Sequence, residues 1–275
     1  MPDTLHAQMI AANGARLYVE QQGTGEPLVL LHAGIADRRQ WDDQLPDFAS
    51  SFAVTRYDHR GWGRSEAPAG PVAFHEDLYA LLSALGIERA HVLGISMGGT
   101  FAIDFALSHP QMVSSLILVD SWLSGFSVPA SEAEQAIWAA FEAALNEGQL
   151  DRANELETDL KLVGIYRTPD MVDAQTRQRL RALHRPAFDR LAEREAMQPW
   201  LKPEPPSAER LGEISAPTLV VYGDLDVPAV PLIAAKLGSE IRNAEVVCMR
   251  GTAHVPNMEQ PREFNGAVLD FLAKL

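Results

Sequence analysis

The sequence has one cysteine, no long apolar run and few basic residues relative to acidic ones. Cys248 alone cannot close an intramolecular disulfide, which suits a reducing compartment. Its place in the apolar run 246–249 predicts a small buried core residue. No apolar run approaches the roughly 18 residues that span a bilayer, and the first ten residues lack the basic-then-apolar pattern of a secretory signal. We therefore expect a soluble, cytoplasmic protein.

The shortage of basic residues argues against two classes of partner. The chain has 23 Lys and Arg against 37 Asp and Glu, which gives a formal net charge of −14. Nucleic acids and anionic membranes are bound by basic surfaces, so neither is expected as a partner. No cluster of His, Cys and carboxylate residues has the spacing of metal ligands, so no metal or other cofactor is expected. The expected partner is a small molecule, and the acidic excess is interpreted as a solvated surface.

The sequence does contain an alternation of short apolar runs and helical patterns. Nearly continuous aliphatic runs are typical of strands that helices cover on both faces. Their alternation with helices predicts an α/β fold with a mostly parallel central sheet and right-handed crossovers. The dipeptide Asn13-Gly14 joins two alternating segments and predicts a hairpin near the start of the chain. The expected strands are 27–32, 52–58, 90–96, 114–120, 218–224 and 244–249, and the helical patterns include 76–85, 97–109, 231–237 and 261–275.

One long interval breaks this alternation. Residues 122–207 contain no convincing strand and end in the stiff segment 202–206, which is rich in proline. So long a connection between two strands is far beyond an ordinary crossover, and it predicts an inserted helical cap. The expected organisation is a core of residues 1–121 and 208–275 with a cap of residues 122–207. Helical stretches within the cap are 132–146, 152–161 and 171–184.

A serine lies between a predicted buried strand and a predicted helix. Gly94-Ile95-Ser96-Met97-Gly98 matches the pattern Gly-x-Ser-x-Gly. In such a turn the glycines remove the Cβ atoms that would clash, and the strained backbone lifts the serine hydroxyl above the strand ends. The N-terminus of the following helix supplies N–H groups for a developing anion. This context predicts Ser96 as a nucleophile.

A nucleophilic serine needs a base, and the base needs a carboxylate that orients it. In a fold of this kind the acid and then the histidine follow the serine, each in a loop after a later strand. The loop after 218–222 carries Asp224 and Asp226, and the loop after 244–249 carries His254. The ends of parallel strands meet at one edge of the sheet, where such sheets bind ligands. His254 is the expected general base.

With these residues in place, the sequence resembles the α/β-hydrolase family, specifically its esterase and lactonase branch with a helical cap. The motif set is most similar to the 3-oxoadipate enol-lactonase group and nearby carboxylesterases, and the resemblance covers nearly the whole chain outside the cap. The motifs that carry it are His32-Ala33-Gly34, the segment 58–65, the serine turn with its extra Gly99, the Gly-x-x-Asp loop that ends at Asp226, and Ala253-His254 followed by Glu259-Gln260-Pro261.

The resemblance implies further site residues. It places the acid at Asp226, although Asp224 and Asp120 remain alternatives because some relatives take the acid from the end of the sixth strand. The oxyanion hole is expected from the N–H groups of Met97 and Gly34. Many relatives have His-Gly followed by a larger residue, so the departure to Ala33-Gly34 leaves Ile35 as an alternative donor. His32 and His59 are interpreted as residues that brace turns near the site.

The cap should contribute the substrate contacts. Trp122, Trp138 and Tyr166 are candidates for substrate binding, although aromatic residues at helical spacing also fit a cap core. A substrate carboxylate could pair with a basic residue of the cap, and the candidates, which also fit solvated surface charges, are Lys161, Arg167 and Arg185.

A serine in place of a carboxylate at the turn argues against epoxide and halide chemistry and implies acyl transfer. The expected activity is a serine hydrolase of a small carboxylic ester or lactone. Alternatives are hydrolysis of carbon–carbon bonds in vinylogous diketones with the same three residues, and a non-catalytic ligand receptor on the same fold.

Overall fold

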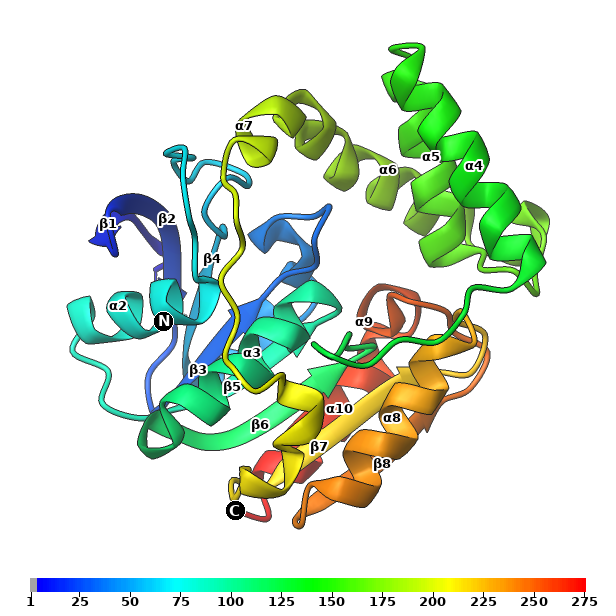
Figure 1. Cartoon of the computed structure of the whole chain (residues 1–275). Coiled ribbons are helices and arrows are strands. Elements are labelled where there is room, and N and C mark those ends of the chain that lie inside the picture. Colours follow the sequence, from blue (N-terminus) through cyan, green and yellow to red (C-terminus); the bar gives the residue numbers. More distant parts are fainter. Residues whose placement is uncertain (1–3) are drawn as a thin grey trace.

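A hairpin, β1 (His6–Ala12) and β2 (Ala15–Gln22), opens the described part of the chain and turns at Asn13-Gly14. The computed structural model describes residues 4–275. In this range eight strands form one sheet in the order β1-β2-β4-β3-β5-β6-β7-β8, and every pair from β4 to β8 is parallel (Figure 1). The remaining strands are β3 (Glu26–Leu31), β4 (Phe52–Tyr57), β5 (Ala90–Ile95), β6 (Val113–Val119), β7 (Thr218–Gly223) and β8 (Ala244–Met249).

The continuous aliphatic runs reflect burial of the sheet on both faces. In β6, Leu116 and Leu118 belong to one core cluster, whereas Ile117 and Val119 belong to the other, because successive side chains of a strand point to opposite faces. The first cluster packs under α2 (Phe74–Ala84), α3 (Met97–Ser108) and α8 (Ala229–Glu240), and the second under α1 (Leu45–Phe48), α9 (Pro256–Glu259) and α10 (Pro261–Leu272). This arrangement confirms the predicted fold class.

The segment between β6 and β7 contains helices and no strand. They are α4 (Glu132–Asn146), α5 (Leu150–Leu162), α6 (Ala174–Asp189) and α7 (Leu191–Glu195). Figure 1 shows these helices above the sheet, with α6 running between the α4–α5 pair and α7. Ser131 begins α4 with a capping box to Glu134, which explains why the start of this helix was readable from the sequence. The start of α6 differs from the expected 171 because Asp173 caps it by accepting the N–H of Thr176.

One prediction about the sheet is wrong. Cys248 was expected in the core, but its side chain is exposed. The reason is that β8 is the last strand of the sheet and has a neighbour, β7, on one side only. Val246, two residues away on the same face of β8, is also 46% exposed. An apolar run therefore identified the strand but not its position at the edge.

No helix within residues 4–275 is long and apolar enough to cross a lipid bilayer.

Candidate active site

The turn at Ser96 connects β5 to α3 through a strained backbone. Ser96 has φ 54° and ψ −118°, a conformation that few residues other than glycine adopt, and its N–H donates to Val119 O at 2.8 Å. A Cβ on Gly94 would lie 2.3 Å from Gly98 O, and one on Gly98 would lie 2.4 Å from Leu31 O. The two glycines are therefore required for the close approach of β3, β5 and α3 that holds the serine in place.

Ser96, His254 and Asp226 form one hydrogen-bonded chain. The Nε2 atom of His254 lies 2.8 Å from Ser96 Oγ, and its Nδ1 atom lies 2.5 Å from Asp226 Oδ2. The three side chains come from the loops after β5, β8 and β7, and all three are buried. The backbone carbonyl oxygen of Lys161 in α5 accepts the His254 N–H at 2.9 Å and so holds the histidine loop. The geometry suits removal of the serine proton by the imidazole.

The charge state of His254 follows from its surroundings. Burial lowers the pKa of His254 below its usual value, the carboxylate of Asp226 opposes this shift, and the ammonium of Lys161 adds to it. The imidazole is therefore neutral at pH 7, as a general base must be. Asp226 accepts a hydrogen bond from the protonated Nδ1, which leaves Nε2 as the acceptor that faces Ser96.

The other two candidate acids have different partners. Asp224 accepts the N–H of Gly251 at 2.6 Å and is exposed, so it braces the loop after β8. Asp120 is buried, and its Oδ1 accepts the N–H of Gly223 at 2.9 Å. Burial and the nearby charge of Asp226 raise the pKa of Asp120 well above its usual value. Neither carboxylate contacts the imidazole.

The loop after β3 brings the expected oxyanion donors to the serine. Residues 33–36 form a turn closed by Ala36 N to Ala33 O, with Gly34 and Ile35 at its centre. A Cβ on Gly34 would lie 3.2 Å from Met97 Sδ, so this loop lies against the start of α3. Within residues 4–275 no hydrogen bond uses the N–H of Gly34, Ile35 or Met97. All three N–H groups are free for a substrate oxygen, and Gly34 and Ile35 both remain candidates.

Nearby side chains hold this turn through hydrogen bonds to its backbone. His32 donates from Nδ1 to Ala33 O at 2.7 Å and accepts the N–H of His59 at Nε2. Trp62 donates to Gly34 O, which orients the peptide whose N–H belongs to Ile35. Gln40 accepts the N–H of Ala33 at 2.8 Å. Burial lowers the pKa of His32, which fits its neutral role as donor and acceptor.

A cavity of about 180 Å³ lies between Ser96 and the inserted helices. Trp122 lines it, as expected from the sequence, and so does Lys161. Sequence reasoning missed part of its wall, because nothing in one sequence shows that these residues face the serine. The missed residues are Ala33, Gln40, Glu157, His184 and Val255.

Several expected cap contacts lie elsewhere. Trp138 does not line the cavity and packs instead near Leu160 and Val227, and Tyr166 is 55% exposed away from it. Arg167 pairs with Glu259 at 2.8 Å, and Arg185 pairs with Asp151 and Asp189. Helical spacing places such residues on a face of the insertion, but it does not decide which face meets the sheet.

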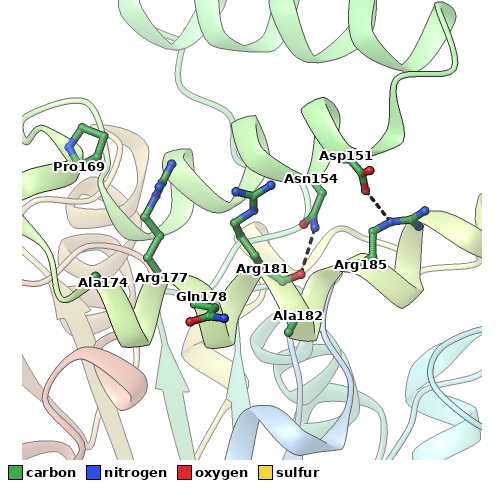
Figure 2. Close-up of a pocket in the computed structure, with 9 residues that line it drawn as sticks. All are labelled: Asp151, Asn154, Pro169, Ala174, Arg177, Gln178, Arg181, Ala182 and Arg185. Atoms are coloured by element: carbon green, nitrogen blue, oxygen red, sulfur yellow. Dashed lines mark hydrogen bonds and ion pairs between the residues drawn. The ribbon is translucent and has the colours of Figure 1, made fainter.

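A larger cavity, of about 430 Å³, opens between α5 and α6 (Figure 2). Three arginines of α6 line it, and Asn154 donates to Arg181 O within it. Arg177 pairs with Asp159, and Arg185 pairs with Asp151, so acidic residues of α5 neutralise most of its charge. This groove lacks a nucleophile, and the smaller cavity over Ser96 is the better candidate site. Among residues 4–275 no cluster of His, Cys, Asp and Glu is arranged to hold a metal ion.

Comparison with known proteins gives consistent results. A family model described as alpha/beta hydrolase fold matches residues 26–261. A 2-hydroxy-6-oxononadienedioate/2-hydroxy-6-oxononatrienedioate hydrolase of Paraburkholderia phymatum is 31% identical over 96% of this chain and 94% of its own length, and one of Klebsiella pneumoniae is 29% identical over 94% and 91%. The crystal structure of the enol-lactonase from Burkholderia xenovorans superposes with a TM-score of 0.77 at 24% identity and covers 97% of this chain and 100% of that one.

Proposed function

The chain belongs to the α/β-hydrolase fold family and is a hydrolase, and from this premise we propose that it cleaves a small carboxylic ester or lactone through an acyl-enzyme on Ser96. The observation that supports the proposal is the chain of hydrogen bonds from Ser96 through His254 to Asp226. A buried hydroxyl, imidazole and carboxylate in this order are what nucleophilic acyl transfer requires.

The proposed reaction has two halves. His254 takes the proton of Ser96 as the hydroxyl oxygen attacks the substrate carbonyl, and Asp226 stabilises the resulting imidazolium. The N–H of Met97 and that of Gly34 or Ile35 bind the developing oxyanion. His254 then returns the proton to the departing alcohol oxygen. In the second half, His254 takes a proton from water as the water oxygen attacks the acyl-enzyme, and it returns that proton to the Ser96 oxygen as the acid is released.

Residues 122–207 are proposed to act as a cap on the core of residues 1–121 and 208–275. Lys161 of α5 and His184 of α6 line the cavity opposite Ser96. Such a cover excludes water from the acyl-enzyme and limits the substrate to what the cavity holds.

A second candidate function is hydrolysis of a carbon–carbon bond in a vinylogous diketone. The observation that favours it is the set of relatives named as 2-hydroxy-6-oxononadienedioate hydrolases, at 29% and 31% identity. The same three residues serve both reactions. A panel of p-nitrophenyl esters, enol-lactones and ring-cleavage dienes distinguishes them, and turnover of the dienes alone would defeat the ester proposal.

Labelling with a fluorophosphonate tests the nucleophile independently of the substrate. We expect wild-type protein to label and Ser96→Ala to label no more than background, with kcat on the best ester lowered by roughly 10⁴-fold or more. Ser108→Ala, an exposed serine at the end of α3, is the matched control and should label like wild type. A non-catalytic receptor would fail to label, and label retained by Ser96→Ala would identify another nucleophile.

A further inference from the structure

Above Ser96, α5 and α6 bring three ionisable side chains to the cavity without pairing them. Glu157 and Lys161 are one helical turn apart and share a face of α5, and His184 faces the cavity from α6. In the described part of the chain the Lys161 ammonium makes no ion pair and no hydrogen bond. Its Nζ lies 6.0 Å from the centroid of the Trp138 ring, a cation–π contact that stabilises the ammonium but brings no negative charge.

Neither of the two neighbours of Lys161 forms an ion pair or a hydrogen bond with it in the described residues. Glu157 is 5% exposed, and its Oε2 has no hydrogen-bond partner among residues 4–275. Burial raises the pKa of Glu157, which favours the neutral acid, although Lys161 opposes this shift. The Nδ1 atom of His184 lies 3.2 Å from Thr158 Oγ1. Burial lowers the pKa of His184 to about 3, so its imidazole is neutral at pH 7. The Lys161 ammonium therefore lines the cavity without an ion-pair partner among the described residues.

From this arrangement we propose that Lys161, flanked by Glu157 and His184, binds a carboxylate of the substrate that is separate from the carbonyl attacked by Ser96. The inference rests on the proposed hydrolase function and narrows its substrates to small esters or lactones that carry a second, anionic group. An ammonium without an ion-pair partner at the wall of a cavity is costly, and a bound carboxylate would pair with it.

The same charge links recognition to turnover. The charged and titratable groups that face His254 are Asp226 from the loop after β7, Lys161 from α5 and His184 from α6. His254 must become positive as the serine attacks, and an uncompensated Lys161 opposes that step. A substrate carboxylate on Lys161 cancels the repulsion. The preference for anionic substrates is therefore expected in kcat as well as in KM.

The test compares monoethyl succinate with ethyl pentanoate, which has an ethyl group in place of the carboxylate. We expect wild-type protein to favour monoethyl succinate in kcat/KM. Lys161→Met should lower the ratio of the two kcat/KM values by roughly 10- to 100-fold, the loss typical of removing one partner of a partly buried charge pair. Lys161→Arg keeps the charge and should retain most of the preference. Lys202→Met, an exposed lysine of the same insertion, is the control for loss of one positive charge and should leave the ratio unchanged.

A second readout does not depend on turnover. Succinate should slow fluorophosphonate labelling of Ser96 in wild-type protein and in Lys202→Met, and much less in Lys161→Met. An unchanged ratio in Lys161→Met, or equal protection by succinate in all variants, overturns the carboxylate site while Ser96 labelling still supports a serine hydrolase. Absence of labelling in wild-type protein instead overturns the proposed function, and this inference with it.

Discussion

Three carboxylates lie close to the histidine loop, and their surroundings separate their roles. Asp226 contacts the imidazole, Asp224 accepts a backbone N–H at the surface, and Asp120 is buried near Asp226, whose charge raises the pKa of Asp120 together with burial. We expect Asp226→Asn to lower kcat by roughly 10⁴-fold, because an amide favours the wrong imidazole tautomer and cannot stabilise the imidazolium. The measurement is kcat on an ester substrate, with folding checked by circular dichroism.

The other two substitutions are the matched controls. Asp224→Asn should change kcat by less than about threefold, because the side chain is exposed and the amide oxygen still accepts the Gly251 N–H. Asp120→Asn should lower kcat by less than about tenfold, because Asp120 makes no hydrogen bond to His254 and the amide oxygen still accepts the Gly223 N–H. The largest loss in Asp120→Asn, with a mild effect in Asp226→Asn, would transfer the role of the acid to Asp120.

At the scale of elements, a buried acid joins α3 to the end of the inserted segment. Ser207 donates to Asp104 Oδ1, and burial raises the pKa of Asp104 to about 6 from its usual value of 3.8. As pH rises, Asp104 therefore loses its proton at a lower pH in the unfolded chain than in the folded protein. Stability from this group is present below about pH 4 and is lost as pH rises to about 6.

Asp104→Asn should remove this pH dependence. The difference in free energy of unfolding between the variant and wild type should increase in favour of the variant by about 2 kcal/mol from about pH 4.5 to about pH 7.5. Urea unfolding at both pH values measures the difference. Asp270→Asn, an exposed acid on α10, controls for the loss of a charge and should show no such gain. A parallel pH dependence in wild type and Asp104→Asn would contradict the assignment.

The elements themselves were largely predictable from the sequence, because their signals are local. The expected strand 244–249 matches β8, and the expected helix 132–146 matches α4, whose capping box is visible in the sequence. What the sequence could not supply was the placement of elements relative to one another. The exposure of Cys248 depends on the strand order, which periodicity does not encode.

In the candidate site, too, the proposed catalytic residues could be predicted from the sequence and part of the cavity wall could not. The serine turn, the acid loop and the histidine loop follow strand ends that any parallel sheet brings to one edge, so Ser96, Asp226 and His254 could be expected to meet. The part of the cavity wall that α5 and α6 supply depends on how these two helices are rotated against the core. Glu157 and His184 were therefore missed, whereas Trp138 and Tyr166 were expected in the wall and are absent from it.

At the scale of the whole molecule, a buried ion pair joins the inserted helices to the histidine loop. Arg167 follows α5, and its guanidinium lies 2.8 Å from Glu259 at the end of α9, with side-chain exposures of 7% and 9%. Arg167 also donates to Gly251 O at 2.8 Å, and Glu259 accepts the N–H of Ala253 at 2.7 Å, next to His254. The pair therefore connects the position of the insertion to the position of the general base.

Arg167→Met should destabilise the fold by about 3 kcal/mol, because it leaves Glu259 buried without its partner. kcat should fall with it, since the loop that carries His254 loses one of its supports. Arg185→Met is the matched control, because its partners Asp151 and Asp189 are exposed, and it should change stability by less than about 1 kcal/mol. The double variant Arg167→Met/Glu259→Gln should recover part of the loss, since no uncompensated carboxylate remains and the amide oxygen still accepts the Ala253 N–H. Urea unfolding and kcat of the four proteins test the link, and equal stability of Arg167→Met and Arg185→Met would show that this ion pair does not hold the insertion on the core.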